Sequence, residues 1–352
     1  MTRLLFAIPG ALETQSGGYE YDRRLLATLG RAGVEAVHCA LPGSFPDPSE
    51  ADLEASLAAI GRLLQRGDAV LIDGLAFGAL PAETLRRIDA ALIALCHHPL
   101  CLETGLSLER ATRLRESEAE AFALAARVIV TSPHTGEVLA REFSVPAEKI
   151  AVAPPGVDPA PRARGSPSPP ALLAVGALIP RKAFDLLVEA LSTLSDLDWR
   201  LRIVGSASES PPTAVALRAL IAAKGLERRV ELTGEIDPSR LARAFDEADL
   251  FISASFYEGY GMALAQALAR GLPIVTATGG AVAETVPDAA SIKVAPGNVE
   301  ALAAALRRAI GDKSLRARLA EASWGAGQAL PRWEETAAIV AGVALEVRKA
   351  PA

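Results

Sequence analysis

The sequence predicts an α/β protein with two domains, each built around a parallel β-sheet. Short apolar segments bounded by turn residues recur along the chain and alternate with helical segments, which is typical of buried parallel strands and their connecting helices. At 352 residues, the chain is too long for one typical hydrophobic core. A proline-rich, polar segment at 161–170 then separates two such patterns and is expected to be a linker.

The first pattern occupies residues 1–160. We predict strands at 4–8, 34–40, 68–73, 90–96 and 127–132. We predict helices at about 49–66 and 107–126, and further helices that begin after Gly18 and at Ser132. The segment 1–8 is too brief for a signal peptide and leads directly into a glycine loop, so we interpret it as the first strand.

The second pattern occupies residues 171–325. We predict strands at 172–176, 199–205, 229–234, 249–255 and 274–276. We predict helices that follow Lys182 and Gly261, another helix at 298–310, and a last helix within 326–352 that begins at Trp333. The helix after Gly261 is rich in Ala and Leu and ends at Gly271, with Pro273 just beyond as a stop signal.

The turn from Glu258 to Gly261 connects a strand to this helix. Gly259 and Gly261 allow a sharp turn and a close approach of another group to the backbone. Unpaired backbone N–H groups at a helix start favour an anion. Because glycines at such turns are common in α/β folds, a plain βαβ unit with Glu258 and Gln266 on the surface remains the alternative from the residues alone.

Composition excludes several classes of function. The formal net charge of −6 argues against an electrostatic binder of nucleic acid. Cys39, Cys96 and Cys101 show no metal-ligand spacing and lie in apolar surroundings, so we expect buried, reduced thiols and a cytoplasmic protein. No apolar run is long enough to span a membrane.

The predicted helix at 107–126 carries Arg110, Arg113 and Arg115 among several glutamates. A solvated, salt-bridged face is the favoured interpretation. The alternative is a basic contact to a charged acceptor or to the inner face of a membrane, which leaves peripheral association open.

His97 and His98 follow the predicted strand 90–96 at its carboxyl end, where ligands bind in open parallel sheets. The alternative is a pair of structural histidines that bond loop carbonyls. Because neighbouring side chains point to opposite sides, only one of the two faces a ligand, and we select His97 with His98 as the fallback. Asp73 ends another strand at this edge and has two possible roles. It either faces the ligand site or caps a turn or helix, and the second role is at least as well supported by the sequence.

The segment from Tyr257 to Pro273 resembles the signature of the family 4 retaining glycosyltransferases. That signature has Glu-Gly-Phe/Tyr-Gly, a second Glu eight positions after the first, and a small-residue helix that ends in Gly-x-Pro. The chain matches every feature except the second Glu, which is Gln266. Further similarity lies in Gly156-Val157-Asp158, and in Trp333-Glu334 at the start of the last helix.

The resemblance implies a GT-B type fold, in which two Rossmann-like α/β domains face each other across a cleft. Residues 1–160 would be the acceptor-side domain and residues 171–325 the nucleotide-sugar domain. The helix within 326–352 would cross back onto the first domain.

The activity implied is a retaining transfer of a sugar from a nucleotide-diphosphate sugar to an acceptor hydroxyl. The acceptor would be a lipid, a polysaccharide intermediate or a small metabolite. A UDP-sugar is the default donor of the family, with GDP- and ADP-sugars open. We find no cluster with metal-ligand spacing and expect no required cofactor or metal, and the sequence indicates no protein partner.

The resemblance also assigns roles to individual residues. Lys182 matches a phosphate-binding lysine, whereas the usual Gly-Arg-Leu is Gly176-Ala177-Leu178, so Arg181 is expected to replace the missing arginine. The residues assigned to catalysis are His97, Arg181, Lys182 and Glu258. The residues assigned to donor binding are Gly17, Gly18, Gly259, Tyr260, Gly261, Met262 and Gln266.

Two other classes of function remain. A nicotinamide dehydrogenase would also have two α/β domains, but the chain has no Gly-x-Gly-x-x-Gly with a later acidic residue. A nucleotide-sugar epimerase shares the architecture and is the alternative enzyme. Ala177 and Gln266 also raise the alternative of a non-catalytic nucleotide-sugar-binding scaffold.

Overall fold

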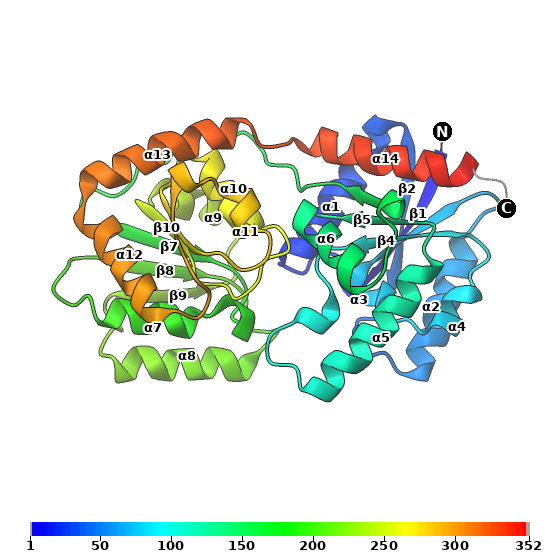
Figure 1. The fold of residues 1–352 in the computed structure, drawn as a ribbon, viewed down its shortest axis with the longest axis horizontal. Coiled ribbons are helices and arrows are strands. Elements are labelled where there is room, and N and C mark those ends of the chain that lie inside the picture. The colour runs from blue at the N-terminus through cyan, green and yellow to red at the C-terminus, as the bar shows by residue number, and fades with distance from the viewer. Residues whose placement is uncertain (1, 350–352) are drawn as a thin grey trace. The chain divides into compact units, whose positions relative to one another are not determined.

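The computed structural model describes residues 2–349 and divides the chain into two compact units (Figure 1). The first unit combines the residues up to Gly156 with those from Pro331 onward, and the second runs from Val157 to Leu330. Each unit contains a six-stranded, wholly parallel sheet with helices packed on it. This arrangement confirms the α/β fold class.

The first sheet has the strand order β2-β1-β3-β4-β5-β6. Its strands are β1 Thr2–Pro9, β2 Val34–Leu41, β3 Ala69–Asp73, β4 Ala91–Cys96, β5 Arg127–Val130 and β6 Ile150–Val152. The helices of this unit are α1 Gly17–Thr28, α2 Glu50–Leu63, α3 Gly74–Phe77, α4 Ala82–Arg86, α5 Leu108–Leu124, α6 Pro133–Glu142 and α14 Trp333–Lys349.

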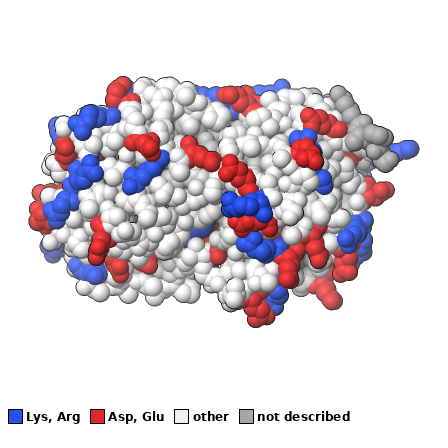
Figure 2. All heavy atoms as spheres, viewed as in Figure 1, with Lys and Arg blue, Asp and Glu red and all other residues white. Residues whose placement is uncertain are grey.

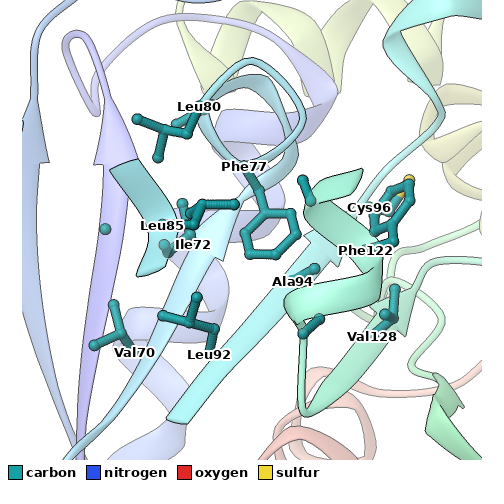
Figure 3. Close-up of a cluster of buried hydrophobic side chains, with 14 of the residues drawn as sticks. Val70, Ile72, Phe77, Leu80, Leu85, Leu92, Ala94, Cys96, Phe122 and Val128 are labelled. Carbon is teal, nitrogen blue, oxygen red and sulfur yellow. The ribbon is translucent and has the colours of Figure 1, made fainter. Parts of the chain in front are cut away.

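The core of the first unit forms because its strands are apolar on both faces. Among the side chains of β3 and β4, Ile72 and Leu92 lie around the ring of Phe77 of α3, and Cys96 lies beside Phe122 of α5 (Figure 3). The rings of Phe77 and Phe122 stack with their centroids 6.0 Å apart. Burial of each such aromatic ring removes a large apolar area from water, so this packing holds α3 and α5 against the sheet.

Helix α14 completes the first unit from the far end of the sequence. The ring of Trp333 meets Tyr21 edge-on at 5.7 Å, and the hydroxyl of Thr336 donates to the carbonyl of Pro154 at 2.6 Å. Gly156 is required beside it, because a Cβ there would lie 2.2 Å from the backbone nitrogen of Trp333. The last helix therefore belongs to the core of the first unit.

The second sheet has the order β12-β11-β10-β7-β8-β9. Its strands are β7 Ala171–Val175, β8 Arg200–Val204, β9 Val230–Gly234, β10 Leu250–Ser253, β11 Ile274–Ala277 and β12 Ser291–Val294. The helices of this unit are α7 Phe184–Ser192, α8 Pro211–Ala223, α9 Pro238–Asp246, α10 Met262–Ala269, α11 Val282–Thr285, α12 Val299–Gly311 and α13 Lys313–Gln328.

The proline-rich segment at 161–170 is bound to the second unit. Backbone amides of Arg164 and Gly165 donate to the carbonyl of Asp246 at 2.9 Å. The carboxylate of Asp249 accepts from the amides of Ser166 and Ala171. The segment is irregular because of its prolines, yet these bonds hold it against the second unit, beside the end of α9 and the start of β7.

Acidic and basic side chains alternate on the face shown in Figure 2. The three arginines of α5 each pair with a carboxylate: Arg110 with Asp47, Arg113 with Glu109 and Arg115 with Glu142. The three cysteines are buried and free, as expected. Among residues 2–349, no helix combines the length and apolar character that a bilayer crossing requires.

Candidate functional site

The loop after β7 brings two cations to the carboxyl end of the second sheet. Pro180–Lys182 forms a single 3₁₀ turn before α7, which places Arg181 and Lys182 side by side. The stem of Lys182 crosses Gly176, where a Cβ would lie 2.9 Å from the lysine Cε. Because Gly176 has no side chain, Lys182 has the room to extend across the carboxyl end of the second sheet.

Lys182 and Arg181 converge on the carboxylate of Glu258, which is 8 % exposed. The Lys182 Nζ lies 2.6 Å from Glu258 Oε1, and the Ser255 hydroxyl donates to the same oxygen at 2.7 Å. Arg181 Nη1 lies 3.7 Å from Glu258 Oε2 and donates to the Tyr257 carbonyl at 2.9 Å. Burial raises the pKa of Glu258, but Lys182 and Arg181 outweigh it, so the net shift is downward and the carboxylate stays charged.

A glycine-built turn fixes the backbone on either side of Glu258. Gly261 has φ 93° and caps α10, a conformation that favours glycine. The loop after β11 packs so closely that a Cβ on Gly279 would lie 1.9 Å from the Phe256 carbonyl oxygen. Glu258 and Gly280 form an isolated parallel bridge, and the amide of Ala281 donates to the Glu258 carbonyl at 2.9 Å.

The start of α10 presents backbone amides beside this carboxylate. Met262 is the first residue of α10, so its amide lies among those without a partner inside the helix. Gln266 lies one turn further along and is partly buried.

The ring of Tyr260 points away from these amides into an apolar cluster with Val157, Ala265, Ala269 and Leu330. Burial there raises the pKa of its phenol to about 12.

In the first unit, His97 lies at the carboxyl end of β4 beside the start of α1. Its Nε2 is 3.1 Å from Asp73 Oδ2 and 3.5 Å from Asp22 Oδ1. A Cβ on Gly18 would lie 3.4 Å from His97 Cδ2, so the first turn of α1, which begins at Gly17, lies against the imidazole. The edge of the His97 ring also meets Tyr21, with centroids 5.2 Å apart.

Burial and neighbouring charges shift the pKa values of Asp22 and His97. Asp22 is 1 % and Asp73 3 % exposed. Burial first, and then the charge of Asp73, raise the pKa of Asp22 to about 7. Burial lowers the pKa of His97, but the two carboxylates outweigh it and raise this pKa to about 10. A positive charge is therefore favoured between Asp22 and Asp73.

The neighbouring His98 has different surroundings. Its Nε2 lies 3.4 Å from Glu103 Oε2. The first turn of α1 lies against His97, and the carboxylates of Asp22 and Asp73 face the same ring. The geometry of the first unit therefore groups His97, not His98, with Gly18.

A buried glutamate holds the turn that follows these histidines. Glu118 of α5 is 2 % exposed, and its carboxylate accepts from the amides of Leu100 at 2.6 Å and Cys101 at 3.0 Å. Burial raises its pKa to about 7, against the opposing effect of these bonds. Glu118 therefore fixes the chain just beyond His97 and His98.

The structure forms two clusters from the predicted site residues. Glu258, Arg181 and Lys182 come together in the second unit, and Gly17, Gly18 and His97 in the first. The sequence analysis missed Asp22 and Glu118, which look like surface residues of polar helices. Asp22, Asp73 and His97 are also the described residues whose ligand atoms, within 4.8 Å of one another, could hold a metal ion.

Asp73 has two roles that the sequence left as alternatives. Its Oδ1 accepts from the amide of Leu75 at 2.9 Å and so caps α3. Its Oδ2 faces His97. One oxygen of Asp73 thus caps a helix, and the other faces the candidate site.

Family models match nearly the whole described chain. Residues 14–161 match the model described as Glycosyltransferase Family 4, and residues 160–324 match Glycosyl transferases group 1. The D-inositol 3-phosphate glycosyltransferase of Xylanimonas cellulosilytica is 30 % identical over 250 residues. That alignment covers 66 % of this chain and 60 % of the relative, so the chain spans less than two thirds of that protein.

Solved structures show the same fold at low sequence identity. The sucrose-phosphate synthase of Thermosynechococcus elongatus has a TM-score of 0.81 at 21 % identity, and the alignment covers 95 % of this chain and 96 % of that one. The Anabaena protein HepE, solved in complex with UDP, has a TM-score of 0.74 at 17 % identity, covering 97 % and 99 %. The chain belongs to the family 4 glycosyltransferases and has their GT-B fold of two Rossmann-like domains.

Proposed function

We propose that this chain is a retaining glycosyltransferase that moves a sugar from a nucleotide-diphosphate sugar to an acceptor hydroxyl. The observation that carries the proposal is the cluster of Lys182, Arg181 and Glu258 beside the start of α10. Two cations face one carboxylate, so the three side chains carry a net positive charge. A diphosphate is the anion that this arrangement suits.

The proposed chemistry follows from where negative charge develops. As the glycosidic bond breaks, charge grows on the terminal phosphate of the leaving nucleoside diphosphate. Lys182 and Arg181 neutralise that charge. Little reorganisation is needed, because Glu258 already holds Lys182 in place and Ser255 in turn donates to Glu258.

The donor sugar is assigned to the turn around Glu258. Its carboxylate accepts hydrogen bonds from sugar hydroxyls, and the amides of Gly259, Gly261 and Met262 bind sugar and phosphate oxygens. Gln266 accepts from a ribose hydroxyl. Tyr260 contributes through its backbone, since its ring belongs to the apolar cluster with Val157.

The first domain is assigned to the acceptor. His97 lines the reaction centre, and the amides of Gly17 and Gly18 approach the donor phosphates and the acceptor. The acceptor hydroxyl attacks on the face that the diphosphate leaves, which retains the configuration of the anomeric carbon. No side chain is assigned as a covalent nucleophile.

A UDP-sugar is the proposed donor. The support is that UDP-sugars are the common donors of the family and that HepE was solved with UDP. A thermal-shift panel of UDP, GDP and ADP tests this assignment, because a ligand at about 100 times its Kd stabilises the protein by about 2.7 kcal/mol. If only GDP or only ADP stabilised the protein, that nucleotide would replace UDP as the proposed donor nucleotide.

The activity itself is tested by incubating the protein with several nucleotide sugars and measuring diphosphate release with and without acceptors. Acceptor-dependent release is expected, and NMR of the product gives the anomeric configuration. Interconversion of the sugar without release would indicate an epimerase. Nucleotide binding with neither reaction would indicate a non-catalytic scaffold, the alternative that Ala177 and Gln266 raise.

A further inference from the structure

The short helix α11 is bonded to the turn before α10 at two points. The amide of Ala281, which precedes α11, donates to the Glu258 carbonyl at 2.9 Å. The hydroxyl of Thr285, the last residue of α11, donates to the Tyr260 carbonyl at 2.8 Å. Val282 at the start of α11 is fully buried, so the helix is anchored in the core of the second unit. Helix α11 therefore holds two carbonyls of the turn that the proposed function assigns to the donor.

The Tyr260 carbonyl and the Gly261 N–H belong to one peptide group. This peptide bond is trans, and in a planar trans peptide the C=O and N–H bonds point in opposite directions. The hydrogen bond from Thr285 holds the carbonyl toward α11. The Gly261 N–H is therefore directed away from α11.

The Thr285 hydroxyl has a second acceptor within reach. The Ala281 carbonyl, four residues back, lies 3.1 Å away, and a threonine in a helix commonly makes such a bond. A hydroxyl group has only one proton to donate. Because the Tyr260 carbonyl is the nearer acceptor, the bond to the turn is the stronger of the two.

The Gly261 N–H has no acceptor of its own. Gly261 is buried and has a φ of 93°, a conformation that favours glycine. Within residues 2–349, its N–H donates to no backbone or side-chain group. Buried backbone N–H groups without an acceptor are rare in folded proteins. At the start of a helix such as α10, an anion is the ligand that satisfies them.

We infer that Thr285 is a positioning residue for the diphosphate: its hydroxyl fixes the peptide group between Tyr260 and Gly261 and so aims the Gly261 N–H at a phosphate oxygen. The inference rests on the proposed function, which assigns the diphosphate to this turn. Thr285 acts on the donor only through that amide. Because the amide is oriented before the ligand arrives, binding requires little reorganisation of the turn.

Two substitutions separate the hydroxyl from the shape of the side chain. Thr285→Val removes the hydroxyl with almost no change of shape, and Thr285→Ser keeps it. Calorimetry gives the Kd of each protein for UDP and for pyrophosphate, which carries the diphosphate without a base. Thr285→Val should bind both about tenfold more weakly, because one hydrogen bond to a charged ligand loses its orientation. Thr285→Ser should bind both as the native protein does.

Thr193→Val is the matched control in the same unit. Thr193 follows the end of α7, whereas Lys182 precedes its start, and the Thr193 hydroxyl donates to the Ala190 carbonyl at 2.8 Å. Removal of this hydroxyl should leave both Kd values unchanged. Denaturant unfolding of every variant separates a loss of stability from a loss of diphosphate affinity. Thr285→Ala replaces Thr285→Val if the valine variant does not fold.

Three results would overturn the inference. The first is no saturable binding of pyrophosphate to the native protein. The second is equal pyrophosphate affinity in the native protein and in folded Thr285→Val, which would assign the hydroxyl proton to Ala281. The third is a loss of affinity in Thr285→Ser as large as that in Thr285→Val, which would assign the effect to packing.

These measurements require no sugar transfer, so they are separable from the proposed activity. A protein that binds pyrophosphate with the help of Thr285 but releases no diphosphate from any nucleotide sugar would support the inference and contradict the transferase.

Discussion

Glu258 is surrounded by groups that compensate its charge. Lys182, Ser255 and Arg181 contact its two oxygens, so a buried carboxylate that would otherwise be costly is kept ionised. The same contacts hold Lys182 in one position before any ligand arrives. A preorganised cation of this kind stabilises developing charge more than a mobile surface lysine does.

Replacing Lys182 with alanine tests this role. Loss of one preorganised group costs about 3 kcal/mol in the barrier, so Lys182→Ala should lower turnover about a hundredfold. Lys224→Ala, at an exposed lysine after α8, is the control and should turn over normally. Far-UV circular dichroism checks that the fold survives. Near-normal turnover in a folded Lys182→Ala protein would remove Lys182 from the site.

Gln266 stands where the family signature has a second glutamate. A glutamine keeps one carbonyl acceptor but gives up the charge. Neutral hydrogen bonds contribute about 0.5–1.5 kcal/mol and charged ones about 1.5–3 kcal/mol. Donor affinity, measured by calorimetry, should therefore be at least as high for Gln266→Glu as for the native protein, and lower for Gln266→Ala. Equal affinity in Gln266→Ala would show that Gln266 does not touch the ribose.

Single residues also show where sequence reasoning reached its limit. His97 was selected over His98 from strand alternation, and its proximity to Gly18 follows from the end of β4. Asp22 could not be selected, because a polar residue in a helix looks solvent-exposed until the neighbouring elements are placed. Tyr260 lies in a family motif, yet its ring is part of an apolar cluster that only the tertiary structure reveals.

At the scale of elements, the turn before α10 depends on a second turn packed against it. Gly279 lies so close to the Phe256 carbonyl that any side chain must push the two turns apart. Gly279→Ala should therefore lower the free energy of unfolding by about 1–3 kcal/mol and weaken donor binding as well. Denaturant unfolding and calorimetry measure the two effects.

Gly325→Ala is the matched control for this substitution. Gly325 is an exposed position within α13, and a Cβ there meets nothing within 4 Å. Alanine in a helix interior is favoured over glycine by about 0.5–1 kcal/mol, so this variant should be slightly more stable. If Gly279→Ala matched the stability and donor affinity of Gly325→Ala, the two turns would not be coupled as described.

Helix α5 holds the turn after the histidines through Glu118, and this link should depend on pH. The pKa of Glu118 is raised from 4.5 to about 7 in the folded protein, chiefly by burial. Between these values the unfolded chain has lost the proton and the folded chain keeps it. The contribution of Glu118 to stability is therefore present below pH 4.5 and is lost as the pH rises through 7.

The test compares the native protein with Glu118→Gln by denaturant unfolding from pH 5 to pH 8. In the variant an NH2 group, which cannot accept from a backbone amide, replaces one oxygen, whereas the protonated acid keeps both oxygens, so the variant should be less stable at pH 5. That deficit should shrink by about 2.5 kcal/mol between pH 5 and pH 8, because only the native protein must ionise a buried group. A deficit that does not change with pH would contradict the raised pKa.

Prediction of the elements succeeded where the local signal was strong. The apolar strands at the centre of both sheets and the helices at 49–66, 107–126 and 298–310 lie where predicted, within a few residues at the ends. Strand β6 has three residues, too few for a periodic pattern, and α8, α9 and α13 were not proposed. The three helices are stabilised by packing on the second unit, which a local sequence pattern does not reveal.

At the scale of the whole molecule, the first unit is built from both ends of the chain. Helix α14 packs on the first sheet through Trp333 and Thr336. A chain that stops at Leu330 should lose protection from hydrogen exchange in β1 and in β3–β6, because the apolar surface under α14 becomes exposed. The strands of the second sheet should keep their protection. Unchanged exchange in the first sheet would mean that α14 adds nothing to its stability.

The path of the chain makes the second unit a contiguous insertion in the first. The chain leaves the first unit after Gly156 and re-enters it after Leu330. Val157 and Leu330, the residues just inside these two crossings, pack together with Tyr260 in one cluster. The second unit of a relative can thus be transplanted as a single gene cassette cut at these two peptide bonds, and Val157, Leu330 and Tyr260 would arrive together because all three lie inside the cassette. One contiguous exchange of this kind leaves both parts of the first unit in their own sequence context.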